Sequence, residues 1–155
     1  MTENVRLIAR QLGQLQRMRT YLAFSVERCS HLFPVQDWQS LDPEKHEMLA
    51  AFRIRFSEFK EHLGKTMRAI AIKEEKEVER FGSVLAFMEK LEVIESAERW
   101  KLIREIRNAI NHEYDDDGTR LSEFFAQMLA AAPELFGNHE KLLAFCQDAY
   151  GIQPD

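Results

Sequence analysis

Residues 3–30 read ENVRLIARQLGQLQRMRTYLAFSVERCS, and an apolar side chain recurs there every three or four positions. The repeat has one interruption, Arg19, and contains Val5, Ile8, Leu12, Leu15, Leu22, Val26 and Cys29. This spacing places the apolar side chains on one stripe of a long helix. The stripe predicts an edge helix of a helical bundle or, alternatively, a coiled-coil-like seam within the chain or with a second copy.

A connector over residues 31–46 separates this helix from the next one. Pro34 ends the first helix, because proline lacks the backbone N–H that a helix interior requires. Asp42 can cap a new helix, and Pro43 suits its first position. The apolar stripe that follows predicts a second helix extending to about residue 80, with a charged, solvent-exposed end.

The rest of the chain predicts shorter helices. Ser83 and Ser96 are the expected caps of a third and a fourth helix, and the run DDDG ends the fourth. A fifth helix and a shorter sixth are expected on either side of Pro133 and Gly137. No segment alternates with period two for the length of a strand. The sequence therefore predicts an all-α fold, one domain over residues 1–155 arranged as an up-and-down bundle of four to five main helices.

Composition excludes several classes of protein. The formal net charge of −5 argues against a bulk phosphate binder, so any contact with nucleic acid must be local. Cys29 and Cys146 stand alone in sequence, which indicates buried thiols in a reducing compartment rather than a disulfide framework. The charged N-terminus does not resemble a secretory signal, and no apolar run has membrane-spanning length. We expect a cytoplasmic protein without a membrane partner.

A cluster of functional residue types occurs in REIRNAINHEYDDDG, residues 104–118. Successive helical residues turn by about 100°, so Asn108 and His112 are neighbours one turn apart. Arg107 and His112 are five residues apart and converge only if the helix ends near Asn111, a residue that tolerates a left-handed cap.

An arginine and a histidine that lie side by side can cleave RNA. A neutral histidine can take the proton from an RNA 2′-hydroxyl, because its pKa lies near neutrality. An arginine beside it can hold the phosphate and stabilise the charge that develops there. Cleavage of RNA by this chemistry needs no metal and no other cofactor. Its products end in a 2′,3′-cyclic phosphate and a 5′-hydroxyl. The same residues also suit a plain helix end, where arginine and histidine complement the helix dipole.

The segment RNAINHEY, residues 107–114, resembles the signature of the HEPN superfamily, R-x-x-x-x-H with a polar residue directly after the arginine. It is similar to HepT-type toxins in particular, whose motif extends to R-x-x-x-x-H-x-Y. Arg107, His112 and Tyr114 match the fixed positions, and Asn108 matches the polar one. The family motif lies at the end of a late helix in an α-helical bundle of about this length. Only the motif makes the resemblance specific.

The resemblance implies a ribonuclease that acts as a homodimer, with two motifs facing one cleft. Arg107 and His112 would be catalytic, supported by Asn108, and Arg104 and Lys101 would add positive charge for RNA. HepT toxins are encoded with a small MNT-type nucleotidyltransferase antitoxin, which can transfer AMP onto the motif tyrosine, here Tyr114. A bulky anionic nucleotide at that position would block RNA by size and charge.

Two other functions stay open from the sequence. Some relatives are non-catalytic, nucleotide- or substrate-binding partner subunits of a nucleotidyltransferase; alternatively, the chain is a structural bundle that only dimerises. His62, Lys65 and Arg68 share a helix face, which is either a surface for RNA or a partner or a plain solvated face. The run Asp115–Asp117 is expected to be a solvated loop rather than a metal site, because consecutive residues rarely converge on one ion.

Overall fold

The computed structural model describes residues 2–109 and 116–155, and for residues 107–109 it describes only the helical backbone. Within these ranges it contains five α-helices and no strand, which confirms the all-α class. They are α1 (Glu3–Ser30), α2 (Pro43–Lys73), α3 (Phe81–Lys90), α4 (Ala97–Ala109) and α5 (Gly118–Tyr150). None of the described helices is both long enough and apolar enough to cross a membrane.

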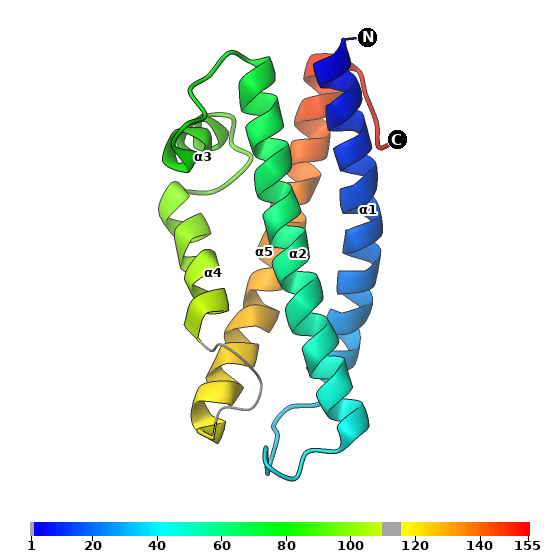
Figure 1. The fold of residues 1–155 in the computed structure, drawn as a ribbon, viewed down its shortest axis with the longest axis vertical. Helices are drawn as coiled ribbons and strands as arrows, with labels where there is room; N and C mark the ends of the chain where they lie inside the picture. The colour runs from blue at the N-terminus through cyan, green and yellow to red at the C-terminus, as the bar shows by residue number, and fades with distance from the viewer. Residues whose placement is uncertain (1, 110–115) are drawn as a thin grey trace.

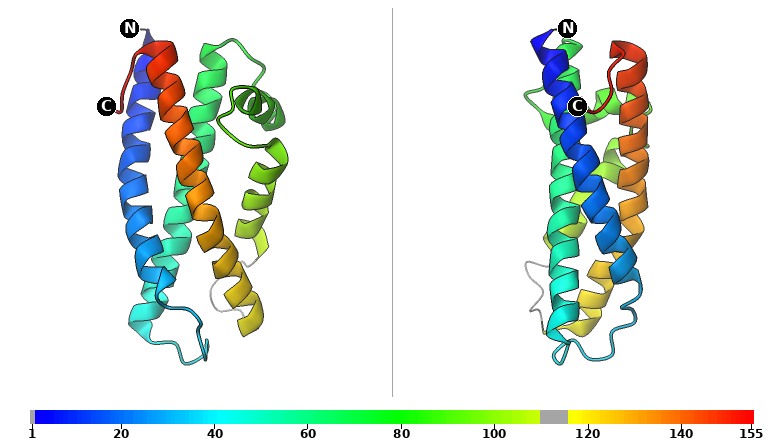
Figure 2. Two further views of the ribbon diagram at one scale, coloured as in Figure 1. Left: turned by 180° about the vertical axis from the view of Figure 1, so that it is seen from behind. Right: turned by 90° about the vertical axis from the view of Figure 1, so that its right-hand side faces the viewer.

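The helices form an up-and-down bundle (Figure 1). The chain descends in α1, rises in α2, descends in α4 and rises again in α5, so that successive long helices are antiparallel. The short α3 lies across the start of α4 and packs against α2, whereas α4 packs against α5 and reaches α2 through Trp100. Helix α5 lies behind α2 in Figure 1; seen from behind in the left view of Figure 2, it lies in front of α2, between α1 and α4.

The apolar stripe of α1 is buried within this bundle. Ile8, Leu12, Leu15 and Leu22 are inaccessible to solvent, and α1 packs mainly against α2 and also contacts α5. The stripe is therefore covered by the chain's own helices, as predicted for an edge helix. Thr2 caps the helix, since its hydroxyl accepts a hydrogen bond from the Val5 N–H at 3.3 Å.

Arg19, the interruption in that stripe, joins α1 to α5 through a polar cluster. Its guanidinium donates to a Glu140 carboxylate oxygen at 2.8 Å, to the Phe136 carbonyl at 3.3 Å and to His139 Nδ1 at 3.2 Å. The His139 side chain is completely buried, and burial together with the Arg19 charge lowers its pKa to about 4. Because Nδ1 accepts from an arginine, the ring hydrogen is on Nε2, which has no hydrogen-bond partner among the described residues.

The second helix begins as predicted and ends earlier. A carboxylate oxygen of Asp42 accepts from the Glu44 N–H at 2.8 Å, and Pro43 is the first helical residue. The prediction that the helix extends to about residue 80 is wrong. Glu75 adopts a φ of 58°, and the Lys76 N–H donates to the Ala71 carbonyl at 2.9 Å. These are the features of a Schellman motif, here built without glycine.

Of the two predicted serine caps, one is confirmed and one is wrong. The Ser96 hydroxyl accepts from the Arg99 N–H at 3.0 Å at the start of α4. Ser83 lies inside the first turn of α3, which begins at Phe81 after a cap residue, Arg80, that makes no side-chain capping bond. The helix starts earlier because Phe81 packs against the core.

The predicted division of the last helix is also wrong, because α5 is continuous through Pro133. The proline ring points to solvent, while Ala131, Ala132 and Leu135 on either side of it are buried. Burial of this stripe outweighs the roughly 3 kcal/mol that a proline costs in a helix interior. The helix ends at Gly151, whose φ of 66° is the left-handed cap that favours glycine.

The connector after α1 is fixed by aromatic packing. Trp38 stacks on Phe125 of α5, with ring centroids 5.7 Å apart and planes 13° apart. Its indole N–H donates to the Ser122 hydroxyl at 2.9 Å. Cβ of a larger residue at Gly118 would lie only 3.0 Å from the Trp38 ring, so a glycine allows this close approach. The connector therefore closes the end of the bundle at which α5 begins.

Both cysteines are buried apolar residues, as predicted. Burial raises the pKa of Cys29 to about 11 and that of Cys146 to about 12. At neutral pH both are thiols, and the thiol is a poor nucleophile.

Candidate functional site

The motif begins in the last described turn of α4. The helical backbone of α4 is described to Ala109 and includes Arg107 and Asn108, whose side chains are outside the description. His112 and Tyr114 lie outside the described residues, and so does Asn111, where the sequence places the end of the helix. Arg104, one turn before Arg107, is described and exposed.

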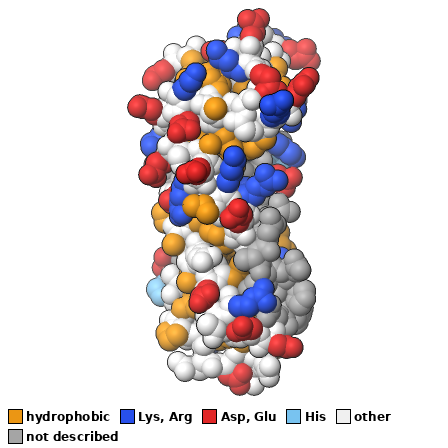
Figure 3. All heavy atoms as spheres, turned by 90° about the vertical axis from the view of Figure 1, so that its left-hand side faces the viewer, with side chains coloured by type: hydrophobic (Ala, Val, Ile, Leu, Met, Phe, Trp, Pro, Cys, Tyr) orange, Lys and Arg blue, Asp and Glu red, His pale blue; other side chains and the backbone are white. Residues whose placement is uncertain are grey.

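A groove lies beside this helix, between α2 and α4. We call it the α2–α4 groove; it has a volume of about 350 Å³. Its walls and floor include Lys60, Gly64, Lys65 and Arg68 of α2, Trp100 and Arg104 of α4, and Phe81 at the start of α3. Figure 3 views the side of the molecule that carries α3 and α4, and several Lys and Arg side chains lie near one another across its middle.

Gly64 gives this groove its floor. A Cβ at this position would lie 3.3 Å from Phe81 Cζ and 3.9 Å from Trp100 Cζ2. Glycine in the middle of a helix costs about 1 kcal/mol relative to alanine. Here it lets two aromatic rings from α3 and α4 rest close to the α2 backbone. The Gly-Lys-Thr sequence at 64–66 is thus part of a helix interior and not a phosphate loop.

The groove carries four cations and little opposing charge. Lys65, Arg68 and Arg104 are exposed, and the salt bridges between described residues do not involve them. Lys60 is buried, with its ammonium 5.0 Å from the centroid of the Trp100 ring. Glu61 is the acidic residue among those that line the groove. A protein of net charge −5 thus concentrates positive charge beside its α4 motif.

Of the two residues predicted to bind RNA, only one lines the α2–α4 groove. Arg104 lines the groove, whereas Lys101 is exposed and does not line it. Lys65 and Arg68 line it too, so their shared face is part of a groove rather than a plain solvated surface. His62 does not line it, and its Nδ1 lies 3.1 Å from the Glu58 carbonyl oxygen one turn earlier. Sequence reasoning missed the aromatic floor, for which the one signal was a glycine inside an apolar helical stripe.

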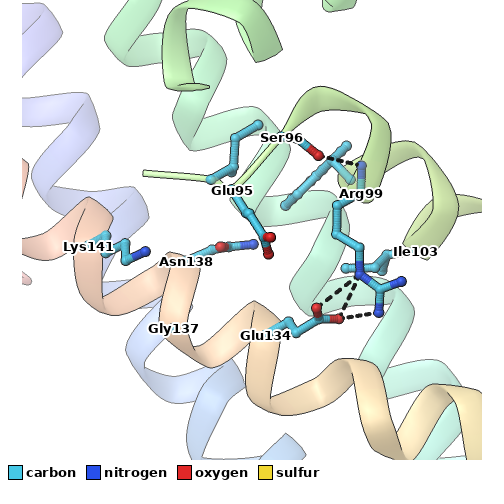
Figure 4. Close-up of a pocket in the computed structure, with 10 residues that line it drawn as sticks. Glu95, Ser96, Arg99, Ile103, Glu134, Gly137, Asn138 and Lys141 are labelled. Atoms are coloured by element: carbon cyan, nitrogen blue, oxygen red, sulfur yellow. Dashed lines mark hydrogen bonds and ion pairs between the residues drawn. The ribbon is translucent and has the colours of Figure 1, made fainter. Parts of the chain in front are cut away.

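The other side of α4 forms a smaller pocket of about 190 Å³ against α5 (Figure 4). Arg99 Nε lies 2.9 Å and 3.1 Å from the two carboxylate oxygens of Glu134, and the second guanidinium nitrogen also donates to this carboxylate. The hydrogen bond to Glu134 raises the pKa of Arg99. Arg99 therefore anchors α4 to α5, and its charge is neutralised within the chain.

The acidic run after the motif contains a helix cap. A carboxylate oxygen of Asp117 accepts from the N–H groups of Thr119 and Arg120 at 3.0 Å and 3.2 Å, at the start of α5. Asp116 is exposed, and Asp115 lies outside the described residues. Among the described residues, no group of three or more His, Cys, Asp or Glu side chains is arranged to hold a metal ion.

Comparison of the chain with protein-family models, with curated proteins and with solved structures gave no match. The family resemblance therefore depends on the motif residues themselves.

Proposed function

We propose that this protein is a HEPN-type endoribonuclease that cleaves RNA without a metal ion. In this reaction His112 removes the proton from a 2′-hydroxyl, and the 2′-oxygen bonds to the adjacent phosphorus. The bond from phosphorus to the 5′-oxygen breaks, and that oxygen takes up a proton. The products are a 2′,3′-cyclic phosphate and a 5′-hydroxyl.

The other motif residues have roles that follow from their chemistry. Arg107 holds the phosphate and stabilises the negative charge on its oxygens in the transition state. Asn108 orients the phosphate or the histidine. The observation that carries the proposal is the spacing Arg107, His112 and Tyr114 on and after α4, a helix that also contributes Arg104 to a basic groove.

The proposal includes a homodimer, because one arginine and one histidine make a sparse site and two copies supply two of each. It also includes control by an MNT-type nucleotidyltransferase antitoxin that transfers AMP to Tyr114. An adenylylated tyrosine two residues after His112 would place an anion where the RNA phosphate must bind. We assign the reaction to the cytoplasm, where thiols such as Cys29 and Cys146 remain reduced.

The test is an RNA cleavage assay in EDTA with the full chain, shown by mass spectrometry to be unmodified. Wild-type protein should cleave and leave 2′,3′-cyclic phosphate ends, whereas Arg107→Ala and His112→Ala should each lose at least about a hundredfold in rate. Arg99→Ala is the matched control, since this arginine of the same helix is paired with Glu134. Absence of cleavage of every RNA tested by a folded, unmodified dimer would refute the enzyme and favour the nucleotide-binding alternative.

A further inference from the structure

The α2–α4 groove carries positive charge that the described part of the fold does not use. Arg19, Arg28 and Arg99 are paired with carboxylates in salt bridges, and none of them lines this groove. Three of the four cations that line it, Lys65, Arg68 and Arg104, are exposed and come from two helices far apart in sequence. Within the part of the chain that the structure describes, these three cations form no salt bridge, and like charges brought together repel one another, so their placement favours an anionic ligand.

The dimensions of the groove fit a chain rather than a point charge. Lys60 and Arg68 lie on the same helix, and at 1.5 Å per residue the stretch between them extends about 12 Å. A stacked nucleic-acid strand advances about 3.4 Å per nucleotide, so the groove matches about three or four nucleotides. On the opposite wall, Arg104 is followed one turn later by Arg107, at the end of α4 that carries the motif.

The floor of the groove suits the bases of a single strand. The half-buried ring of Phe81 approaches the helix backbone at Gly64 and is the accessible ring, whereas Trp100 is buried beneath it with the Lys60 ammonium over its face. Aromatic side chains beside a cationic groove are the combination that proteins use to bind single strands without sequence preference. A mononucleotide site would instead enclose its ligand, whereas Lys65, Arg68 and Arg104 of this groove are exposed on the surface.

We infer that the α2–α4 groove binds the phosphate backbone of single-stranded RNA and leads the strand to the motif at the end of α4. Lys65 and Arg68 contact phosphates outside the scissile bond, and Arg104 contacts the phosphate next to the reaction site. The inference rests on the proposed function for the identity of the ligand. It predicts that binding and cleavage are separable, because Lys65 and Arg68 lie on α2, far in sequence from His112.

The experiment measures RNA binding in a chain that cannot cut. A fluorescently labelled single-stranded RNA of about twelve nucleotides is titrated with His112→Ala protein, with and without Lys65→Glu and Arg68→Glu. The two charge reversals should weaken binding at least about tenfold. Between about 50 and 200 mM salt they should also reduce the slope of log K against log salt by about 1.4, or about 0.7 for each phosphate that the variant no longer neutralises.

The matched control reverses two charges on another helix. Arg10→Glu and Arg17→Glu change the net charge equally, and both residues are exposed on α1, on the opposite side of the bundle in Figure 1. This pair should alter the affinity less than about threefold. Lys65→Gln with Arg68→Gln provides a second groove variant without new negative charge, and circular dichroism shows whether each variant is folded.

The outcomes distinguish the groove from the nuclease. Weakened binding in the groove variants supports the groove, and it does so even if wild-type protein cleaves no RNA. Equal weakening in the groove and control pairs would show a general charge effect and overturn the inference, even if wild-type protein cleaves RNA in a motif-dependent way. Saturable binding of ATP that depends on Lys65 and Arg68, without RNA binding, would overturn it in favour of a free nucleotide.

Discussion

Acidification should destabilise this protein through His139. The imidazole is completely buried, and Arg19 donates a hydrogen bond to its Nδ1 at 3.2 Å. Protonation would place a positive charge away from water and, in addition, beside the Arg19 guanidinium. For this reason the pKa is lowered to about 4 in the folded state, against 6.5 for an unperturbed histidine.

The sign and size of the effect follow from this difference. Between about pH 6.5 and pH 4 the unfolded chain binds a proton at His139 and the folded chain does not, so the free energy of unfolding falls as the pH falls. Each tenfold difference in proton affinity is worth about 1.4 kcal/mol, which gives a loss of roughly 3 kcal/mol over the whole window and roughly 2 kcal/mol by pH 5. Above about pH 6.5 this contribution to stability no longer changes.

Urea unfolding followed by circular dichroism at several pH values measures this loss. His139→Leu is the comparison, because it has similar apolar volume and cannot titrate. The difference in the free energy of unfolding between wild-type protein and His139→Leu should change by roughly 2 kcal/mol between pH 7 and pH 5. A difference that stays constant over this range would refute the assignment of a buried neutral histidine.

Three further outcomes are expected. Pro133→Ala should raise the free energy of unfolding by about 1–2 kcal/mol in urea titrations, because the ring is exposed and alanine restores an N–H donor to the Leu129 carbonyl; an unchanged midpoint would contradict this account of α5. Cys29 and Cys146 should resist iodoacetamide at about pH 8 and react fully in urea, as mass spectrometry would show; rapid labelling of the folded chain would mean that they are not buried thiols. Arg99→Ala should lower stability by about 1 kcal/mol, because the ion pair with Glu134 is partly exposed, and Glu134→Ala should cost no more when added to it; additive effects would contradict a shared interaction.

The fold was predictable where local and tertiary signals agree. The stripe of α1 and the cap at Asp42 and Pro43 define their helices from sequence, since the residues that favour helix are those that the bundle buries. Pro133 and Glu75 show the limit of this reasoning. The proline is a local stop signal that buried neighbours override, and the glutamate takes a left-handed conformation that its residue type does not favour.

The sequence predicted only the part of the candidate site whose residues lie close together along the chain. Arg104 and the motif residues after it lie within one short stretch of sequence, so their spacing can be interpreted without a structure. The groove depends on the packing of α2 against α3 and α4, which brings Lys65 and Arg68 next to Arg104. No sequence period connects these residues, and therefore only the three-dimensional arrangement shows that they share one surface.

Trp100 separates two spaces, since it lines both the α2–α4 groove and the pocket against α5. The second tryptophan, Trp38, stacks on Phe125 at the end of the bundle where α5 begins. The chain therefore contains two intrinsic fluorophores in different surroundings. In a Trp38→Phe background all tryptophan emission comes from the groove floor, beside the Lys60 ammonium. The intensity and wavelength of that emission then respond to changes in either of the two spaces that Trp100 lines, without an added dye.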